Sequence, residues 1–341
     1  MTSPGPVGGN AASFVFRATC VVILLLIGSA VSVADEPVVS AFGPRGPIGC
    51  GPSPRRVKRL TIDRPGIYEN ILVDGEWGTS TLVKITADGV TLRNCEIRHG
   101  RHNAVTVYAK NVVIESCKIH HVLAGSFADQ RDAHGITGRP TGLVIRDCDI
   151  GLVSGDCIQF DPGRGEWDDV LIENCTLWTG PLPEAAGDFK RGERPGENAV
   201  DTKQRAANPR SRMTIRNCRM YGWNQPAQID NMSALNLKNH VDVTVENCLF
   251  RDNEICFRVR GGKGEYGGAR VAIDHCAVYD SAVAVRAEDQ IEQLRINRLG
   301  IGHGVGQSLR VVGGGRGPGF RQTGDHTPPP YETVLKTGLR P

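Results

Sequence analysis

The sequence predicts an all-β protein, a right-handed parallel β-helix built from about eight stacked coils of three short strands. Three observations predict this fold. A phrase built around a cysteine recurs along the chain, its apolar residues alternate, and a third apolar strand follows each copy after a turn. A short repeat separated by loops of varying length is typical of solenoids, in which each unit packs on its neighbours.

Before the coils, the chain has the features of a cleavable signal peptide. An apolar run over residues 21–27 follows Arg17, and the small residues Ser32 and Ala34 precede an expected cut near Ala34. The apolar stretch that ends at Ala34 has 14 residues, fewer than the roughly 20 that span a bilayer. We therefore expect removal of residues 1–34, export to the periplasm, the cell surface or the medium, and no stable membrane anchor.

The amino-acid composition predicts three regions in the rest of the chain. Residues 35–60 are rich in proline and glycine and should form an extended leading segment, whereas residues 313–341 should form a disordered tail. One β-helix domain fills residues 61–312. The chain has 40 basic and 37 acidic residues, a formal net charge of +3. These charges are too evenly mixed to predict a nucleic-acid partner, and we expect a monomer.

Each copy of the phrase predicts two short strands joined by a bend. Apolar residues alternate up to Leu92 and again from Cys95, and the phase shifts at Asn94 between them. Successive phrase cysteines are 22, 31, 27, 43, 30 and 28 residues apart, so loops of varying length interrupt a constant unit. The copies contain Cys95, Cys117, Cys148, Cys175, Cys218, Cys248 and Cys276, and a degenerate eighth copy has Leu299 in the cysteine position.

The bend residues and the cysteines have structural roles. Polar residues such as Asn94 and Asn217 should stack at one corner and hydrogen-bond along the axis. The cysteines should point inward, one above another at the strand spacing of about 4.8 Å, as small buried hydrophobes. A linear stack offers no tetrahedral metal site, and a disulfide ladder would bend regular coils. We therefore expect free thiols.

The third strand of each coil presents the candidate site. Its inward residues form one core column, and the residues between them form two outward columns that are charged on the middle coils. The expected inward column is Val105, Ile136, Ile158, Val200, Ala227, Phe257 and Val283. The expected outward columns are Thr137, Gln159, Asp201, Gln228 and Arg258, and Arg139, Asp161, Lys203, Asp230 and Arg260.

Two interpretations of these charges stay open. Stacked charges of opposite sign stabilise a sheet surface by about 0.2–1 kcal/mol per pair, and the columns could be only such a ladder. The alternative is a binding site. It is favoured by the long loop between Cys175 and Cys218, which leads into the strand of Asp201 and Lys203 and should wall a groove. The loop contains Trp178, Phe189, Lys190, Arg191 and Arg194.

Together these features resemble a known family. Such coils, with a long loop beside a third strand of acidic and basic residues, are similar to the pectate-lyase-like β-helix superfamily of polysaccharide lyases, polygalacturonase-type hydrolases and alginate epimerases. The resemblance covers roughly residues 60–312, but a coil phrase marks only the fold. The local likeness to a lyase site is GENAVDTK, residues 196–203. It implies an exported enzyme that acts on an acidic, uronate-containing polysaccharide.

The resemblance also implies a mechanism, calcium-assisted β-elimination. In such lyases, calcium held by aspartates neutralises the substrate carboxylate, and a lysine or arginine removes the C5 proton while the bond at O4 breaks. Oxygen-rich, carboxylate-bearing sites suit calcium, and arginine suits carboxylate. Carried over, the ligands are Asp161, Asp201 and Asp230. The catalytic residues are Lys203 as base with Arg258 or Arg260 gripping carboxylate, and the substrate-binding residues are Gln159, Gln228, His134 and Arg139.

Two segments depart from the patterns of that superfamily. SGDCIQ, residues 154–159, is similar to a polygalacturonase segment with two adjacent aspartates but has Asp156 alone. The carboxylate pair of an inverting hydrolase is therefore not evident there. RDAHGI, residues 131–136, resembles the Asp-Pro-His-Asp stretch of alginate epimerases with two positions changed. Asp132 and His134 are either turn residues or an acid at the edge of the groove.

Three classes of function stay open. The leading one is a polysaccharide lyase. The others are a glycoside hydrolase or uronate epimerase on a similar chain, and a non-catalytic carbohydrate-binding or surface-structural β-helix. Elimination leaves an unsaturated uronate, hydrolysis leaves saturated reducing ends, epimerisation leaves the length unchanged, and a binding module makes no product.

Overall fold

The computed structural model describes residues 40–161, 165–224, 232–263, 267–314 and 316–339. The expected signal peptide lies outside these ranges, so its removal and the export that it implies stay predictions. No helix within the described ranges is both long enough and apolar enough to cross a membrane.

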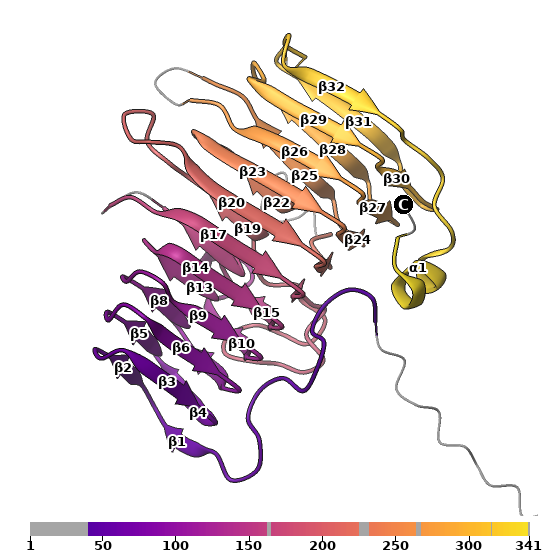
Figure 1. Cartoon of the computed structure of the whole chain (residues 1–341). Coiled ribbons are helices and arrows are strands. Elements are labelled where there is room, and N and C mark those ends of the chain that lie inside the picture. The colour runs from indigo at the N-terminus through magenta and orange to yellow at the C-terminus, as the bar shows by residue number, and fades with distance from the viewer. Residues whose placement is uncertain (1–39, 162–164, 225–231, 264–266, 315, 340–341) are drawn as a thin grey trace, which may run out of the picture. The chain divides into compact units, whose positions relative to one another are not determined.

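The chain winds into a right-handed parallel β-helix, which confirms the predicted fold class (Figure 1). Each coil contributes one strand to each of three parallel sheets of ten strands, here called A, B and C. Sheet A contains β1 (Arg55–Val57), β4 (Ile71–Gly78), β7 (Glu96–Gly100), β10 (Lys118–Val122), β15 (Asp149–Val153), β18 (Thr176–Trp178), β21 (Arg219–Tyr221), β24 (Leu249–Arg251), β27 (Ala277–Tyr279) and β30 (Gly300–Ile301). Sheet B contains β2 (Leu60–Ile62), β5 (Val83–Ile85), β8 (Val105–Val107), β13 (Ile136–Gly138), β16 (Ile158–Phe160), β19 (Asn198–Thr202), β22 (Ser233–Leu237), β25 (Ile255–Arg260), β28 (Val283–Glu288) and β31 (Gln307–Val312). Sheet C contains β3 (Gly66–Glu69), β6 (Val90–Arg93), β9 (Val113–Glu115), β14 (Thr141–Arg146), β17 (Asp168–Glu173), β20 (Ser211–Arg216), β23 (Val241–Glu246), β26 (Arg270–Asp274), β29 (Gln293–Asn297) and β32 (Phe320–Thr323).

The phrase cysteines lie inside the coil, as predicted. All seven are fully buried in one continuous apolar core, with their sulfurs as free thiols. The Cys117 thiol lies 3.6 Å from the carbonyl oxygen of Leu92 on the preceding coil. The stack therefore packs as small apolar side chains with weak S–H donors.

The bend before each cysteine is a single residue in the left-handed conformation. Asn94, Asn174, Asn217 and Asn247 have φ values between 48° and 55°, which asparagine tolerates better than most residues. The Asn247 side-chain amide donates to the side-chain oxygen Oδ1 of Asn217 on the neighbouring coil at 2.7 Å. This contact is one step of the predicted corner ladder.

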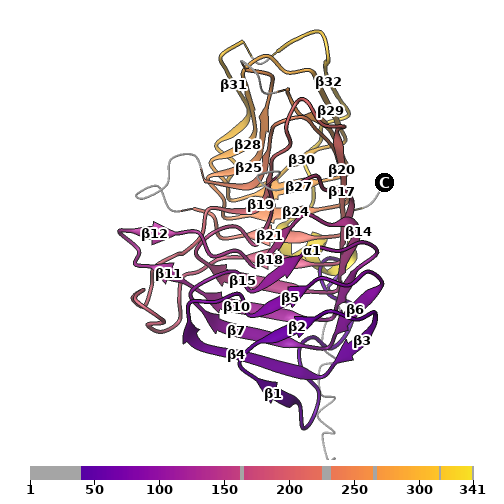
Figure 2. The same ribbon diagram turned by 90° about the vertical axis from the view of Figure 1, so that its left-hand side faces the viewer.

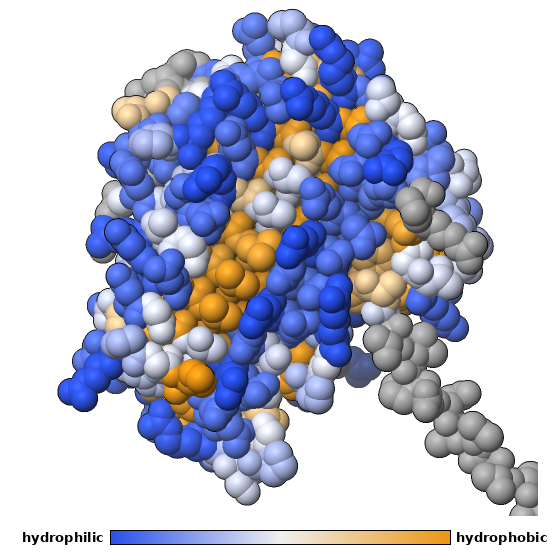
Figure 3. All heavy atoms as spheres, in the orientation of Figure 1, coloured by the Kyte–Doolittle hydropathy of each residue, from blue (hydrophilic) through white to orange (hydrophobic). Residues whose placement is uncertain are grey.

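The outer face of sheet C has an ion-pair ladder that the phrase contains but that our sequence analysis did not include. The residue two places before the phrase cysteine alternates in sign over the first six copies, from Arg93 to Glu246, and is again acidic in the seventh, at Asp274. Side chains on neighbouring coils pair, with N to O distances of 2.5 Å for Arg146 to Glu115 and 2.7 Å for Arg216 to Glu173. In Figure 3 a row of hydrophilic side chains runs along the coils beside an apolar band.

The ends of the β-helix differ from the prediction. Each sheet has ten strands rather than about eight, because coils without the cysteine phrase continue the stack at both ends. The expected disordered tail is wrong for the residues described: the chain forms β32 and then helix α1 (Tyr331–Thr337). Val334 of α1 packs over Leu249 and Ala277 on the outer face of sheet A.

The leading segment runs back along the coils before it enters the first one. Its backbone N–H groups donate to corner carbonyls, from Gly43 to Asn217 at 3.0 Å and from Gly49 to Ser116 at 2.9 Å. Figure 1 shows this indigo segment beside the coils. These hydrogen bonds hold the part of the segment that the structure describes to the β-helix.

Candidate functional site

The outer face of sheet B carries the charged columns over its middle coils, with the hairpin of β11 (Ala124–Gly125) and β12 (Gln130–Arg131) projecting at one side (Figure 2). The strands that bear these columns pair in parallel register. Successive coils therefore place equivalent side chains one above another. The outward column is Thr137, Gln159, Asp201, Asn236, Arg258 and Arg286.

The residue predicted for one coil of the core column, Ala227, is wrong. β22 pairs with β19 so that Leu235, rather than Ala227, lies beside Val200. Leu235 and Leu237 are both fully buried, and the alternation in SALNL offers more apolar surface to the core than PAQID does. The strand therefore forms later in the chain than predicted.

The shift changes two of the predicted site residues. Gln228 and Asp230 lie outside the described residues. Asn236 takes the outward position between Asp201 and Arg258. Lys238 follows two residues later, where an acidic side chain was expected, so the middle of the site is more basic than the sequence analysis predicted.

Asp201 is held between two lysines. Its side chain is 3% exposed. Its Oδ1 atom lies 3.1 Å from Nζ of Lys238, and its Oδ2 atom lies 3.5 Å from Nζ of Lys203. Gln159 donates to Oδ2 at 3.3 Å, whereas no donor among the described residues meets Oδ1 in hydrogen-bond geometry. Lys203 also reaches Oδ2 of Asp161 at 3.4 Å. The alternating charges of the ladder interpretation are thus present, but they centre on a nearly buried carboxylate.

The backbone near both lysines is held by neighbouring residues. The indole N–H of Trp167 donates to the carbonyl oxygen of Lys203 at 2.8 Å. The N–H of Lys238 donates to the Thr202 hydroxyl at 3.0 Å. Trp167 is itself buried, packed against Phe160 in the core, so the ammonium groups project from fixed backbone.

A buried polar row lies at the beginnings of the sheet B strands. Asn198 donates to Asp156 Oδ1 at 2.7 Å, and Gln159 donates to Asp156 Oδ2 at 2.8 Å. Ser233 donates to Asn198 at 2.8 Å, which continues the row to the next coil. Burial, followed by the charges of Asp201 and Glu197, raises the pKa of Asp156 well above its usual range. Asp156 is fully buried and supports the site from beneath.

His134 belongs to the same row. The backbone N–H of Asp156 donates to its Nδ1 at 3.0 Å, so Nε2 carries the proton of the neutral ring and lies 4.0 Å from Asp132 Oδ2. Burial lowers the pKa of His134. The His134 side chain is 8% exposed, and this places the expected substrate-binding histidine below the surface that a substrate would touch.

Glu197 stands at the edge of the site, immediately before β19. Burial raises its pKa to about 7, and the carboxylates of Asp132 and Asp201 add to this rise against the opposing charges of the two lysines. A carboxyl group that titrates near neutral pH can take and release protons there. Glu197 lies within the GENAVDTK segment, but no role for it follows from the family resemblance.

The pKa of Lys203 is raised, whereas a lysine that acts as a base near neutral pH needs a lowered pKa. Burial lowers its pKa, but Asp201, Asp161 and Asp156 together outweigh burial and raise it above its usual value. The side chain is therefore an ammonium ion at neutral pH. The raised pKa argues against its predicted role as the base.

The arginines of the next coils gather around one buried carboxylate. Glu288, with a side chain 9% exposed, lies 2.6 Å from Arg286 Nε, 2.9 Å from Arg258 Nε and 3.3 Å from Arg260 Nε. Arg139, another expected substrate-binding residue, instead has its guanidinium carbon 5.3 Å from the centre of the Tyr108 ring. The arginines expected to grip substrate thus form a basic cluster one coil beyond Lys238.

The described residues do not fit the expected calcium ion. The oxygens of Asp201 face two ammonium groups and Asp161 faces one of them, so a divalent cation would have to displace cations that already balance these charges. The third expected ligand, Asp230, lies outside the described residues. Within the ranges that the structure describes, no three acidic, histidine or cysteine side chains are arranged to hold a metal ion.

The long loop reaches the site only at its end. Leu182, Ala186 and Phe189 pack against Leu123 and Leu152 beside sheet A. Gly196, near the end of the loop, lies outside that apolar cluster. Its backbone N–H donates to Oε1 of Gln130 at 3.1 Å. The expected wall is therefore limited to the residues around Glu197.

Comparison with known proteins finds solved structures of similar fold, among them the following three. No protein-family model matches the chain, and no curated protein matches its sequence. The pectate lyase Pel9A is 12% identical with a TM-score of 0.49, over 83% of this chain and 70% of that one. An alginate lyase from Paenibacillus sp. is 13% identical with a TM-score of 0.45, over 81% and 87%. The A-module of the Azotobacter vinelandii mannuronan C-5 epimerase AlgE6 is 13% identical with a TM-score of 0.42, over 81% and 79%. By the topology of its own three sheets, the chain is a right-handed parallel β-helix.

Proposed function

We propose that the outer face of sheet B around Asp201 binds an acidic, uronate-containing polysaccharide and cleaves it by β-elimination. One observation carries the proposal: two lysine ammonium groups meet at a nearly buried aspartate beside Glu197, whose pKa is about 7. Cations there suit a substrate that bears carboxylates. A carboxyl group with a pKa near neutral suits removal of a proton next to such a carboxylate.

In the proposed reaction, the ionised Glu197 takes the C5 proton of the uronate. The electron pair of the broken C–H bond forms the double bond between C4 and C5, and the C4–O4 bond breaks. The departing oxygen takes a proton from the Lys203 ammonium group. Lys238 and the neighbouring Arg258 hold the C6 carboxylate and stabilise the charge that develops on it.

This assignment reverses the roles expected from the family resemblance. Lys203 has a raised pKa and is therefore a better acid than base at neutral pH. The lysines supply the positive charge that calcium was expected to supply, so the proposed elimination needs no metal ion. Calcium remains a separate hypothesis, and an experiment with a chelator tests it directly.

Product analysis tests the proposed function. Purified protein is incubated with polygalacturonate, alginate and hyaluronan, each with calcium and each with EDTA. The proposal expects an ultraviolet-absorbing unsaturated uronate from at least one polymer, in EDTA as well as in calcium. Saturated reducing ends, epimerised chains of unchanged length, or no product from any polymer would each overturn elimination, and activity confined to the calcium samples would overturn the metal-free mechanism.

A further inference from the structure

A second polar cleft lies on the outer face of sheet A, separate from the site on sheet B. Its volume is about 540 Å³, and its lining is Arg219, Tyr221, Arg251, Asp252, Asp280 and Tyr331. β21 and β24 supply the first three of these residues, and Tyr331 begins α1. A volume of this size suits a small ligand such as one or two sugar units.

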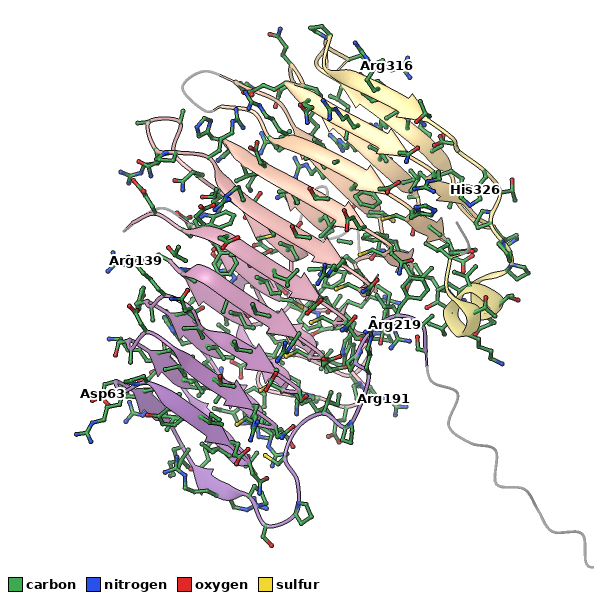
Figure 4. The ribbon with its side chains drawn as sticks, viewed as in Figure 1. Asp63, Arg139, Arg191, Arg219, Arg316 and His326 are labelled. Atoms are coloured by element: carbon green, nitrogen blue, oxygen red, sulfur yellow. The ribbon has the colours of Figure 1, made fainter. Side chains whose placement is uncertain are left out.

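Helix α1 closes one end of the cleft. It packs there because the outward face of sheet A becomes apolar at Leu249 and Ala277. Thr176, Arg219, Leu249 and Ala277 follow one another in register along this face. The last two are fully buried and pack with α1 and with Phe42 of the leading segment. Arg219 is thus the outward residue immediately before the covered part of the sheet, and Figure 4 labels it on the side of the coils that carries α1.

The two arginines of the cleft differ in their partners. Arg251 pairs with Asp280 at 3.0 Å and with Glu332 at 3.5 Å. Arg219 forms no ion pair within 4 Å among the described residues, and the carboxylate of Asp149, whose pKa burial raises against the charge of Arg219, is held by the Trp178 indole N–H at 2.8 Å. The one side-chain hydrogen bond of Arg219 in those ranges is a long one to the Thr176 hydroxyl, 3.4 Å, and its Nε atom is buried without a hydrogen-bond partner. A buried donor without an acceptor is unfavourable until a ligand supplies one.

Aromatic rings hold the Arg219 guanidinium in place. Its central carbon stands 5.3 Å from the centre of the Tyr221 ring, and the Trp178 ring stacks on that tyrosine at 6.2 Å and 13°. A guanidinium on an aromatic face keeps its N–H groups directed outward from its edge, where a carboxylate binds in the same plane. Burial raises the pKa of Tyr221 and of Tyr331, so both hydroxyls remain donors at neutral pH.

We propose that this cleft, called here the sheet A cleft, is a second binding site for an acidic sugar unit of a glycan. The sugar carboxylate binds the edge of Arg219. Asp252 and Asp280, at the rim, accept hydrogen bonds from sugar hydroxyls, and Tyr331 closes the other side. This proposal goes beyond the reaction on sheet B and does not depend on it, because the ligand class follows from the side chains of the cleft itself.

Calorimetric titration of the full chain with trigalacturonate and with trimannuronate tests the sheet A cleft. The titrations are made in the Lys203→Ala background, which removes the proposed proton donor of sheet B and so prevents turnover during the measurement. We expect saturable binding of at least one trimer, an affinity at least tenfold lower after Arg219→Gln, and a smaller loss after Arg219→Lys. Arg212→Gln, which alters an exposed arginine of sheet C, is the matched control and should leave the affinity unchanged. Equal affinity with and without Arg219, or no binding of either trimer, would overturn the proposal.

A second measurement needs no substitution and so cannot be confused with a folding defect. Hydrogen exchange of the unaltered protein is followed with and without the trimer that binds. The proposal expects slower amide exchange in the segments 219–221 and 331–337. Protection confined to the strands of sheet B would contradict the sheet A cleft even if elimination on sheet B were established.

Discussion

The two lysines that meet at Asp201 should contribute unequally to stability because they are unequally exposed. The Lys203 side chain is 31% exposed and the Lys238 side chain is 15% exposed. Lys203→Ala should cost at most about 1 kcal/mol, as for an exposed ion pair. Lys238→Ala should cost about 2–3 kcal/mol, because it leaves a nearly buried carboxylate with less compensation. Urea unfolding of the two variants measures the difference, and a larger loss for Lys203→Ala would contradict this account of the pair.

Glu197 should set the pH dependence of the reaction. Its pKa of about 7 lies above the ordinary glutamate value of about 4.3, so the rate should rise as pH increases through 7 and the carboxylate forms. Glu197→Gln should lower kcat by about 100-fold and abolish this rise. Glu166→Gln, at an exposed glutamate, is the control. A pH profile that keeps its shape in Glu197→Gln would show that another group is the base.

The same pKa shift has a consequence for stability. Because folding raises the pKa of Glu197, its contribution to stability is complete below the unfolded-state value and is lost as pH rises through about 7. Glu197→Gln should therefore gain stability relative to the unaltered protein as pH rises from 5 to 8. Thermal unfolding across this range tests the sign, and a stability of Glu197→Gln that falls relative to the unaltered protein as pH rises would contradict it.

Residues within a strand were easier to predict than residues beside one. Gln159, Asp201 and Arg258 follow from strict alternation, which assigns a face to every residue of a strand. Glu197 precedes β19 in a loop, where alternation assigns no direction. Lys238 was missed because β22 forms later in the chain than predicted. Their places depend on loop geometry, which a single sequence does not specify.

At the scale of the strands, the ladder on sheet C should favour neighbours of opposite charge. Arg146 pairs in register with Glu115 on one side and Glu173 on the other. Arg146→Glu should cost about 1–2 kcal/mol at low salt, because it places three like charges in a row, whereas Arg146→Ala should cost less than about 1 kcal/mol. Added salt should reduce the difference in stability between the two variants, because it screens the repulsion between like charges. Equal melting temperatures of the two variants at low salt would argue against the ladder.

Helix α1 could not be predicted from the composition of its segment. It has seven residues after a run of prolines, too few to be stable alone. Contact with Leu249, Ala277 and Tyr279 on sheet A supplies its apolar partners. Only the three-dimensional arrangement brings those residues to one surface. The number of coils was underestimated for a related reason, because the terminal coils keep the strands but lack the cysteine phrase.

For the whole molecule, the account predicts a core without disulfides. Nine of the cysteines that the structure describes are buried, and burial raises the pKa of the two that lie outside the recurring phrase, Cys157 and Cys256, the latter to about 12. Because the thiolate is the reactive form, native protein should react slowly with a thiol reagent. Protein denatured without reductant should show at least nine free thiols per chain. A titration that finds only one or two would contradict the inert cysteine stack.

The proposed function requires that sheet B cleaves its substrate by elimination rather than by addition of water. The most direct measurement is mass spectrometry of products formed in water enriched in heavy oxygen. The account predicts unsaturated ends that carry no heavy oxygen at the newly formed termini, with the amount of product reduced about 100-fold in Glu197→Gln. Heavy oxygen at the new reducing ends would show hydrolysis and would contradict the account.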